Sequence, residues 1–426
     1  MLQSAVESWT NPSFDRYAAP RSGWGPKPDR KVPMDNITRR DFIKKTSAIL
    51  AAPAVLSFAE TTGKKGQVYP DQRRKYTDSK TGKTVWQMTD TPGCTTHAQY
   101  FTQPGTTPDG RWLLYGSDRG GEKGHLDLFK MDLKTGESVQ LTESKRNLIP
   151  RWSHISQDGK EIYFIEDTSL FRAVNIETLE ERDLCRVENC FRPHQISVSP
   201  DNKNLIDGIF MENKDEADFL KGKGFLIRSA LVVISTDSGK AHRLLDGNTP
   251  LSHAQYCPAD PKLILYCHAG PWWQVQRMWL VNSDGTGNRP IFIQTKFEGA
   301  GHEFWAADGK TIYVTCSGGR QPQGLWAVDA DGANERCVLA GACVGHGTVN
   351  SQKDRFVIDE LYNDCKTGLW IAKKGSTQPQ LLCRTGADWS EKEQEFHPHP
   401  RFLPDSKTVA FTGTMTGSPE VYLVEI

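Results

Sequence analysis

Several histidines near the C-terminus have the residue types and spacing of a metal site. The segment Glu393–Pro400 reads Glu-Gln-Glu-Phe-His-Pro-His-Pro, and two more histidines, His302 and His346, stand at the same place in a repeat described below. Three imidazoles and one amide from this group suit a borderline divalent cation such as Mn²⁺, Fe²⁺ or Zn²⁺. We therefore predict one metal site. The alternative is a loop in which the prolines fix φ and the histidines face solvent.

One short signature recurs seven times along the chain. Each copy has an apolar or aromatic residue, then a turn that resembles Pro-Asp-Gly, then an alternating apolar strand. Thr107–Gly110 ahead of Trp112–Tyr115 is a clear example. The aspartates of the seven turns are Asp109, Asp158, Asp201, Asp260, Asp308, Asp354 and Asp405.

The intervals between these turns predict the fold. Each interval holds a second pair of strands, such as 128–132 and 139–141, separated by Gly and Asp turns. Four short strands per repeat are typical of propeller blades. We predict an all-β, seven-bladed β-propeller as a single domain over residues 60–426. The final strand, 420–426, has no following partner, so we expect it to pair with 83–89 in one blade and close the ring.

Polar residues cluster at one position of the repeat, just before the turn. In a propeller this is the first strand of each blade, which lines the central channel. Every histidine except His125, His242 and His268 lies there, with His154 marginal because it is so close to its turn. The polar residues in this position are His97, Gln99, Arg151, His154, His194, Gln195, His253, Gln255, His302, His346, His397 and His399. We expect them to converge at one mouth of the channel; the alternative is that they only hold water.

These residues give the chain a resemblance to the oligogalacturonate lyases. The resemblance is carried by Arg277–Trp279, Gly301–Trp305, His346 with Asn350, and the Gln394–Pro400 motif, and it covers roughly residues 70–426. It implies a seven-bladed propeller that uses Mn²⁺ to cleave short oligogalacturonates such as digalacturonate by β-elimination. It also implies a base, His302, an arginine for the substrate carboxylate, Arg277, and four metal ligands, His346, Gln394, His397 and His399.

The chemistry of these residue types agrees with that activity. Removing the proton beside a uronate carboxylate produces a carbanion next to a negative charge, which a divalent cation and an arginine stabilise. A neutral histidine takes such a proton near physiological pH. His302 and His253 both occupy the inner-strand position, so the residues alone leave the choice of base open. The residues expected to bind substrate are His97, Arg151, His194, Gln195, His253 and Gln255.

The charge balance excludes some classes of partner. Lys plus Arg and Asp plus Glu both number 52, so the formal net charge is zero. No basic stripe marks a nucleic-acid or membrane-surface binder. A non-catalytic propeller that docks a protein or carbohydrate, and a lyase for another uronate, stay as alternatives. The histidine cluster argues against docking, since docking faces favour aromatic and Arg anchors. A propeller that gates a hydrolase is excluded, because no Gly-x-Ser-x-Gly motif occurs.

The N-terminal region resembles an export signal. Arg39 and Arg40 precede a short, alanine-rich apolar run, Thr46–Ala59, which is too short for a membrane span. We predict a Tat-type signal over residues 34–59, a periplasmic destination, and a mature protein without a membrane span. Residues 1–33, ahead of Met34, are interpreted as an over-extended start. The alternative for this region is an amphipathic N-terminal helix.

The ten cysteines argue against a zinc ribbon or a redox site, because none forms a Cys-x-x-Cys pair. Cys185 and Cys190 are the closest pair in sequence. Several other cysteines stand inside apolar runs, and we expect these to be small core residues.

Overall fold

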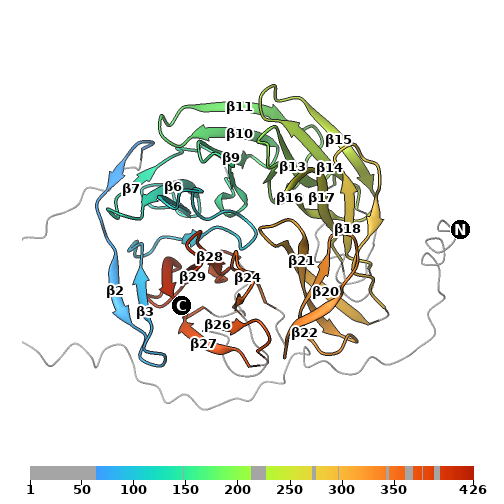
Figure 1. Cartoon of the computed structure of the whole chain (residues 1–426). Coiled ribbons are helices and arrows are strands. Elements are labelled where there is room, and N and C mark those ends of the chain that lie inside the picture. The colour runs from blue at the N-terminus through green and yellow to red at the C-terminus, as the bar shows by residue number, and fades with distance from the viewer. Residues whose placement is uncertain are drawn as a thin grey trace, which may run out of the picture. The chain divides into compact units, whose positions relative to one another are not determined.

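The computed structural model describes residues 64–146, 148–212, 227–270, 275–295, 297–341, 345–359, 368–376, 378–387 and 394–426. These residues form seven antiparallel sheets that follow one another around a ring (Figure 1). The predicted seven-bladed all-β propeller is confirmed. The predicted export signal and the 1–33 segment lie outside the described residues.

The first three blades contain most of the strands up to Gly247; β2 (Arg74–Thr77) and β3 (Thr84–Gln87) belong to blade seven. Blade one contains β4 (Thr96–Ala98), β5 (Trp112–Ser117), β6 (Asp127–Asp132), β7 (Ser138–Gln140) and β1 (Val68–Tyr69). Blade two contains β8 (His154–Ile155), β9 (Glu161–Glu166), β10 (Leu170–Asn175) and β11 (Glu181–Arg186). Blade three contains β12 (Ser197–Val198), β13 (Asn204–Phe210), β14 (Ser229–Ser235) and β15 (Ala241–Gly247).

The next three blades have four strands each. Blade four contains β16 (Leu251–Cys257), β17 (Asp260–His268), β18 (Met278–Asn282) and β19 (Arg289–Pro290). Blade five contains β20 (Glu298–Trp305), β21 (Thr311–Gly318), β22 (Gly324–Asp329) and β23 (Arg336–Ala340). Blade six contains β24 (Gly347–Val349), β25 (Arg355–Ile358), β26 (Gly368–Lys373) and β27 (Gln380–Arg384).

Blade seven joins the two ends of the ring. Its strands are β28 (Arg401–Phe402), β29 (Thr408–Gly413), β30 (Glu420–Glu425), β3 (Thr84–Gln87) and β2 (Arg74–Thr77). The predicted closure is confirmed, because Val85 pairs with Val424 and Gln87 pairs with Tyr422. The N-terminal segment extends further than predicted, since β2 adds a fifth strand to this blade and β1 adds a fifth strand to blade one.

The repeated turn has a local cause. In the first copy, the Asp109 carboxylate accepts hydrogen bonds from the Thr107 hydroxyl at 2.6 Å and from the Arg111 backbone N–H at 3.0 Å. Gly110 follows with φ of 71°, a conformation that glycine adopts without steric penalty. Because the aspartate forms its hydrogen bonds within its own turn, the turn depends only on neighbouring residues and can be recognised from the sequence.

The core lies between neighbouring blades. Between blades six and seven, for example, Leu369 and Leu382 pack with Val409, Phe411 and Tyr422, all fully buried. Burial of each such side chain contributes about 1.5–3 kcal/mol. Each blade therefore depends on both of its neighbours. Among the described residues, no helix is long and apolar enough to cross a membrane.

The described cysteines are all free. Cys257, Cys267, Cys316 and Cys383 are buried, as predicted for small core residues. Cys190 donates to the backbone carbonyl of Thr168 at 3.2 Å, with no disulfide to Cys185. Cys343 and Cys365 lie outside the described residues.

Candidate active site in the propeller channel

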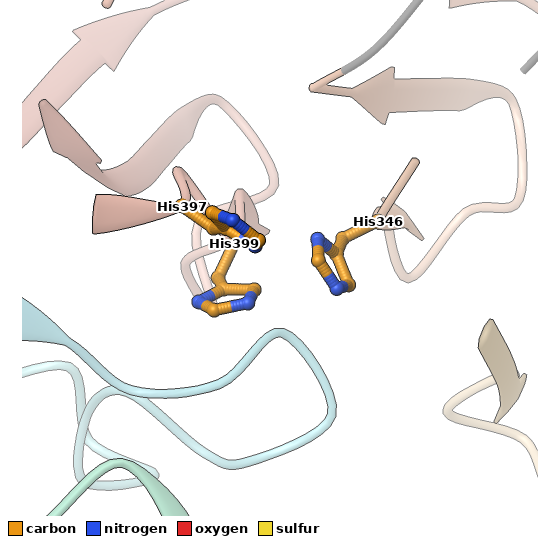
Figure 2. A group of neighbouring side chains, drawn as sticks. All are labelled: His346, His397 and His399. Atoms are coloured by element: carbon orange, nitrogen blue, oxygen red, sulfur yellow. The ribbon is translucent and has the colours of Figure 1, made fainter. Parts of the chain in front are cut away.

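Three histidines from two blades gather at one end of the channel. His346 precedes β24, whereas His397 and His399 follow the 3-10 turn η4 (Gln394–Phe396) and precede β28. Each of the three offers a ring nitrogen within 4.8 Å of the others, and Figure 2 shows the rings together. All three side chains are buried. We call this set the histidine triplet. Three imidazole nitrogens at this spacing fit a divalent cation.

Polar neighbours orient the triplet. The amide oxygen of Gln394 lies 3.1 Å from His399 Nε2, which places the predicted fourth ligand beside the triplet. His346 Nδ1 lies 3.0 Å from Asp359 Oδ2, and the His346 backbone N–H donates to Asp359 Oδ1 at 2.7 Å. A carboxylate on Nδ1 fixes the ring and directs Nε2 toward a cation. The donor set therefore fits the metal site that the sequence predicts.

Asp359 was not identified from the sequence. It is fully buried, and burial raises the pKa of its carboxyl well above the usual value. Burial also lowers the pKa of His346 well below its usual value, so the imidazole is neutral. The separation of 13 residues between His346 and Asp359 could have identified this aspartate from the sequence. Asp207 accepts a hydrogen bond from the His194 backbone N–H at the same separation of 13 residues in blade three.

His302 lies directly beside the triplet. Its ring centroid is 4.4 Å from that of His346. Burial is the main cause that lowers the pKa of His302 well below its usual value, followed by the neighbouring His346 and Arg277. The Thr315 hydroxyl donates to the Gly301 carbonyl at 2.7 Å, and its oxygen lies 3.4 Å from His302 Nδ1. Because the hydroxyl proton is used in the bond to Gly301, the hydroxyl oxygen accepts from Nδ1. The ring proton is therefore on Nδ1, and the lone pair of the neutral ring is on Nε2.

The backbone of His302 is strained into an unusual conformation. Its φ is 53°, inside a β-bulge between Gly301 and Phe304 in the pairing of β20 with β21. His253 repeats this feature in blade four, with a φ of 49°. Left-handed backbone at a non-glycine residue costs on the order of 1–3 kcal/mol and is concentrated at functional sites. The bulges turn both side chains out of the regular alternation of their strands.

Arg277 forms a buried ion pair. Its Nε lies 2.7 Å from Glu303 Oε2, and the two side chains are 5% and 1% exposed. Burial opposes ionisation of Glu303, but Arg277 and His253 lower its pKa to about 2. The pair joins blade four to blade five next to His302. The family resemblance assigned Arg277 to the site, but the sequence did not identify Glu303 as its partner.

The remaining predicted substrate residues surround the triplet on the side of blades one to four. Arg151 forms an ion pair with Glu395, the neighbour of Gln394. The His194 ring stacks on Trp152 with centroids 5.4 Å apart and lies 5.5 Å from His253. Burial lowers the pKa of His194 and of His253, the latter to about 4. These rings are therefore neutral hydrogen-bonding groups.

His97 and Gln195 carry polar atoms that the described residues do not satisfy. His97 Nδ1 lies 2.9 Å from the Ala98 carbonyl, and Gln195 Oε1 accepts from the Thr102 hydroxyl at 2.9 Å. His97 Nε2, His194 Nε2 and Gln195 Nε2 are buried without a hydrogen-bond partner in the described part of the chain. Such groups suit the hydroxyls of a polar ligand.

Two predicted channel residues lie away from the histidine triplet. The Gln255 amide donates to the Glu303 backbone carbonyl at 2.9 Å, and Gln255 and His154 line a cavity to which the histidine triplet does not contribute. The reason is position along the inner strand, since both stand closer to the turn than the other channel histidines do. The structure therefore does not bring Gln255 to the triplet, and its predicted contact with substrate stays a prediction.

Two aromatic residues that the sequence did not single out form the floor of the site. The Tyr100 ring lies 4.7 Å from His399 and 5.4 Å from His346. The Phe101 ring lies 5.1 Å from His346 and 6.1 Å from His302. The stretch from His97 to the Thr107 turn is longer than its equivalent in other blades, which is the signal that could have found this segment.

Known proteins of the same kind cover nearly the whole chain. A model of the family described as oligogalacturonate lyase matches residues 63–426. The oligogalacturonide lyase of Pectobacterium atrosepticum is 27% identical over 387 residues, which is 85% of this chain and 98% of that protein. The oligogalacturonate lyase of Dickeya dadantii is 27% identical over 376 residues, which is 82% of this chain and 95% of that protein.

Solved structures agree. An oligogalacturonate lyase in complex with manganese matches with a TM-score of 0.77 and 27% identity, covering 85% of this chain and 98% of that one. An oligogalacturonate lyase from Vibrio parahaemolyticus has the same TM-score of 0.77 at 24% identity, covering 85% and 99%, and supports the fold. The chain therefore belongs to the oligogalacturonate lyase family.

Proposed function

We propose that this protein is a manganese-dependent lyase that cleaves short oligogalacturonates by β-elimination. The observation that carries the proposal is the histidine triplet, with the neutral His302 ring 4.4 Å from His346. Family membership supports the substrate class, and the related lyase solved in complex with manganese supports the cation. We assign His346, His397 and His399, with Gln394, to the cation.

The cation, when bound, supplies positive charge that stabilises the substrate carboxylate as negative charge develops beside it. Arg277 adds a second, permanent cation near the same place, held in position by Glu303. Preorganised charge in a buried site stabilises a developing anion more effectively than the same charge in water. The role of Arg277 in this proposal is to neutralise the substrate carboxylate.

His302 is the base in this proposal. Its buried, neutral ring presents a lone pair on Nε2, which accepts the proton from C5 of the uronate. The electron pair left at C5 forms the C4–C5 double bond as the bond from C4 to the leaving oxygen breaks. The leaving oxygen keeps that bonding pair and takes up one proton, which balances the one that His302 removed. The products are a 4,5-unsaturated uronate and a shortened saccharide, and no water is consumed. On the other side of the site, neutral side chains orient the sugar hydroxyls, and the charged Arg151 orients the second carboxylate. These neutral side chains are His97, His194, Gln195 and His253.

The direct test is incubation of the purified protein with digalacturonate and Mn²⁺ while ultraviolet absorbance of the conjugated product is followed. We expect absorbance to rise with Mn²⁺ and to stop rising when a chelator is added. A flat trace with galacturonate oligomers and a rise with another polyuronate would replace the proposed substrate. A flat trace with every polyuronate would favour a non-catalytic binding protein.

We also propose export through the Tat pathway, on the basis of Arg39 and Arg40 ahead of the Thr46–Ala59 run. A periplasmic enzyme would meet saccharides that have crossed only the outer membrane. Cell fractionation after replacement of both arginines by lysine tests the proposal. Unchanged recovery of the protein in the periplasm, or its absence from the periplasm before the replacement, would contradict it.

A further inference from the structure

The channel contains a cavity of about 440 Å³ on the side of the repeated turns. It is lined by the innermost strands of blades two to seven and by the segment that follows β4 in blade one, so it belongs to the central channel. The histidine triplet does not line it. Exposed turn residues such as Pro108 and Pro258 form part of its rim, which gives a small solute access from solvent. We call it the lower cavity.

Arg401 brings a positive charge to this cavity. Its Nη1 donates to the Phe101 carbonyl at 2.7 Å, and its other guanidinium nitrogens have no hydrogen-bond partner in the described ranges. It forms no ion pair with a described carboxylate, whereas Arg151 and Arg277 in the same channel each do. The guanidinium of an arginine is charged at neutral pH. A half-buried cation without a counter-charge favours an anionic ligand.

The neighbour of Arg401 in the cavity accepts hydrogen bonds. His154 Nδ1 lies 2.8 Å from the Ile155 carbonyl, so Nδ1 carries the proton and Nε2 is an acceptor. Burial, with a contribution from Arg401, keeps this imidazole neutral by lowering its pKa to about 4. Thr348 and Ser197 add hydroxyl groups to the lining. Among the described lining residues, Arg401 alone is charged, which favours a monoanion with hydroxyl groups over phosphate.

Aromatic side chains complete the cavity. Phe101, Phe304, Trp305 and Phe402 contribute to its walls. Flat apolar rings beside a few hydrogen-bonding groups are typical of small-molecule pockets, and the volume lies within the usual range of roughly 300–1,000 Å³. We propose that the lower cavity binds a monosaccharide-sized sugar acid, with its carboxylate on Arg401 and a hydroxyl on His154 Nε2. This site is distinct from the proposed active site, and ligand binding there does not depend on the lyase activity.

Arg401 also has a structural contact, which the test must separate from binding. The Phe101 carbonyl that accepts its hydrogen bond belongs to the residue whose ring lies 5.1 Å from His346. Loss of Arg401 would therefore disturb the floor of the active site even if the cavity bound nothing. For this reason the deciding measurement is direct binding of a sugar acid, not a change in turnover.

The experiment is calorimetric titration of the full, manganese-loaded chain with D-galacturonate, D-galactose, acetate and inorganic phosphate. We expect galacturonate to bind, and galactose and acetate to bind at least tenfold more weakly. Arg401→Gln should weaken galacturonate binding roughly 10- to 100-fold, the effect of losing a charge-assisted hydrogen bond. Arg355→Gln, an exchange outside the cavity, should bind as the parent protein does. Arg277→Lys, in the proposed active site, should retain this binding event. Failure of the lower-cavity proposal can therefore be distinguished from failure of the lyase proposal.

A second variant covers the case in which Arg401→Gln does not fold. Val349 lines the cavity, and Val349→Trp introduces an indole there while leaving Arg401 and its contact to Phe101 in place. It should abolish the same binding event. Absence of galacturonate binding, binding that is unchanged in every variant that folds, or a preference for phosphate or neutral galactose would overturn the proposal.

Discussion

Asp359 holds His346 through two hydrogen-bonding contacts, one to the backbone and one to the ring. Oδ1 accepts from the His346 N–H at 2.7 Å, and Oδ2 lies 3.0 Å from Nδ1. The pairing of β24 with β25 brings the two residues together, since Gly347 lies opposite Ile358. A ring fixed in this way presents one defined nitrogen to the triplet.

Asp359→Asn should weaken Mn²⁺ binding about 10- to 100-fold, the usual effect of removing a carboxylate behind a histidine ligand. The amide keeps an acceptor for the backbone N–H, so the change acts mainly on the ring contact. Asp207→Asn is the matched control, because Asp207 contacts the His194 backbone in the same way, away from the triplet. Metal titration of both variants measures the difference; equal affinities would refute a role for Asp359 in metal binding.

Replacing His346 and His397 together by Ala should remove bound metal and activity at once, because two of the three converging imidazoles are lost. His125→Ala should change neither, since His125 lies in the segment between β5 and β6, outside the channel position. Metal content after dialysis and turnover of digalacturonate are the two measurements. Stoichiometric metal in the double variant would exclude the triplet as the metal site.

His302→Ala should retain metal and substrate binding while lowering turnover by about 10²- to 10⁴-fold, the range for loss of a general base. His253→Ala is the natural comparison, because His253 occupies the equivalent bulge in the preceding blade with nearly the same φ. We expect its effect to fall mainly on KM. Normal turnover in His302→Ala, combined with collapse in His253→Ala, would show that the base is His253.

Arg277→Ala should impair both turnover and substrate binding, and should also reduce the free energy of unfolding by about 3–5 kcal/mol, because Glu303 is left buried without a counter-charge. Arg320→Ala is a useful control, since Arg320 forms ion pairs with Glu298 and Glu335 without a contact to the triplet. It should affect stability and leave turnover unchanged. Chemical denaturation and steady-state kinetics separate the two effects, and wild-type kinetics in folded Arg277→Ala would remove Arg277 from the mechanism.

Asp127 should make stability depend on pH. Burial, offset in part by hydrogen bonds from Ser144 and Thr142, raises its pKa to about 6 from an ordinary value of 3.8. Between these values the folded state holds a proton that the unfolded state has released, so stability falls as pH rises from about 4 to 6, by at most about 3 kcal/mol. Asp127→Asn should flatten this dependence, whereas the exposed Asp237→Asn should not. Denaturation at several pH values tests it; parallel profiles for wild type and Asp127→Asn would contradict the assignment.

The sequence was sufficient for the fold because its determinants are local. Asp109 and Gly110 specify their turn within a few residues, and the same pattern at the other turns reveals the blades. Ring closure was predictable because the strand at 83–89 precedes the first repeated turn and the strand at 420–426 follows the seventh. The histidines were recognisable as a group because the repeat gives each of them the same position.

The unpredicted parts depend on contacts between segments far apart in sequence. The contact between Asp359 and His346 depends on the register of β24 and β25, and the Glu303 partner of Arg277 comes from the next blade. Tyr100 contacts histidines of three blades because its segment leaves the regular inner strand. Such side-chain contacts are set by tertiary packing, which periodicity does not encode.

The pairing of β3 with β30 has a consequence for the order of events during synthesis. Val85 and Val424 are partners in one sheet, yet nearly the whole propeller is translated between them. At about 5–20 residues per second, β3 waits roughly 20 to 70 seconds for its partner to be made. During that interval the edge of β3 that will face β30 is unpaired, and the ring closes only after β30 has been made.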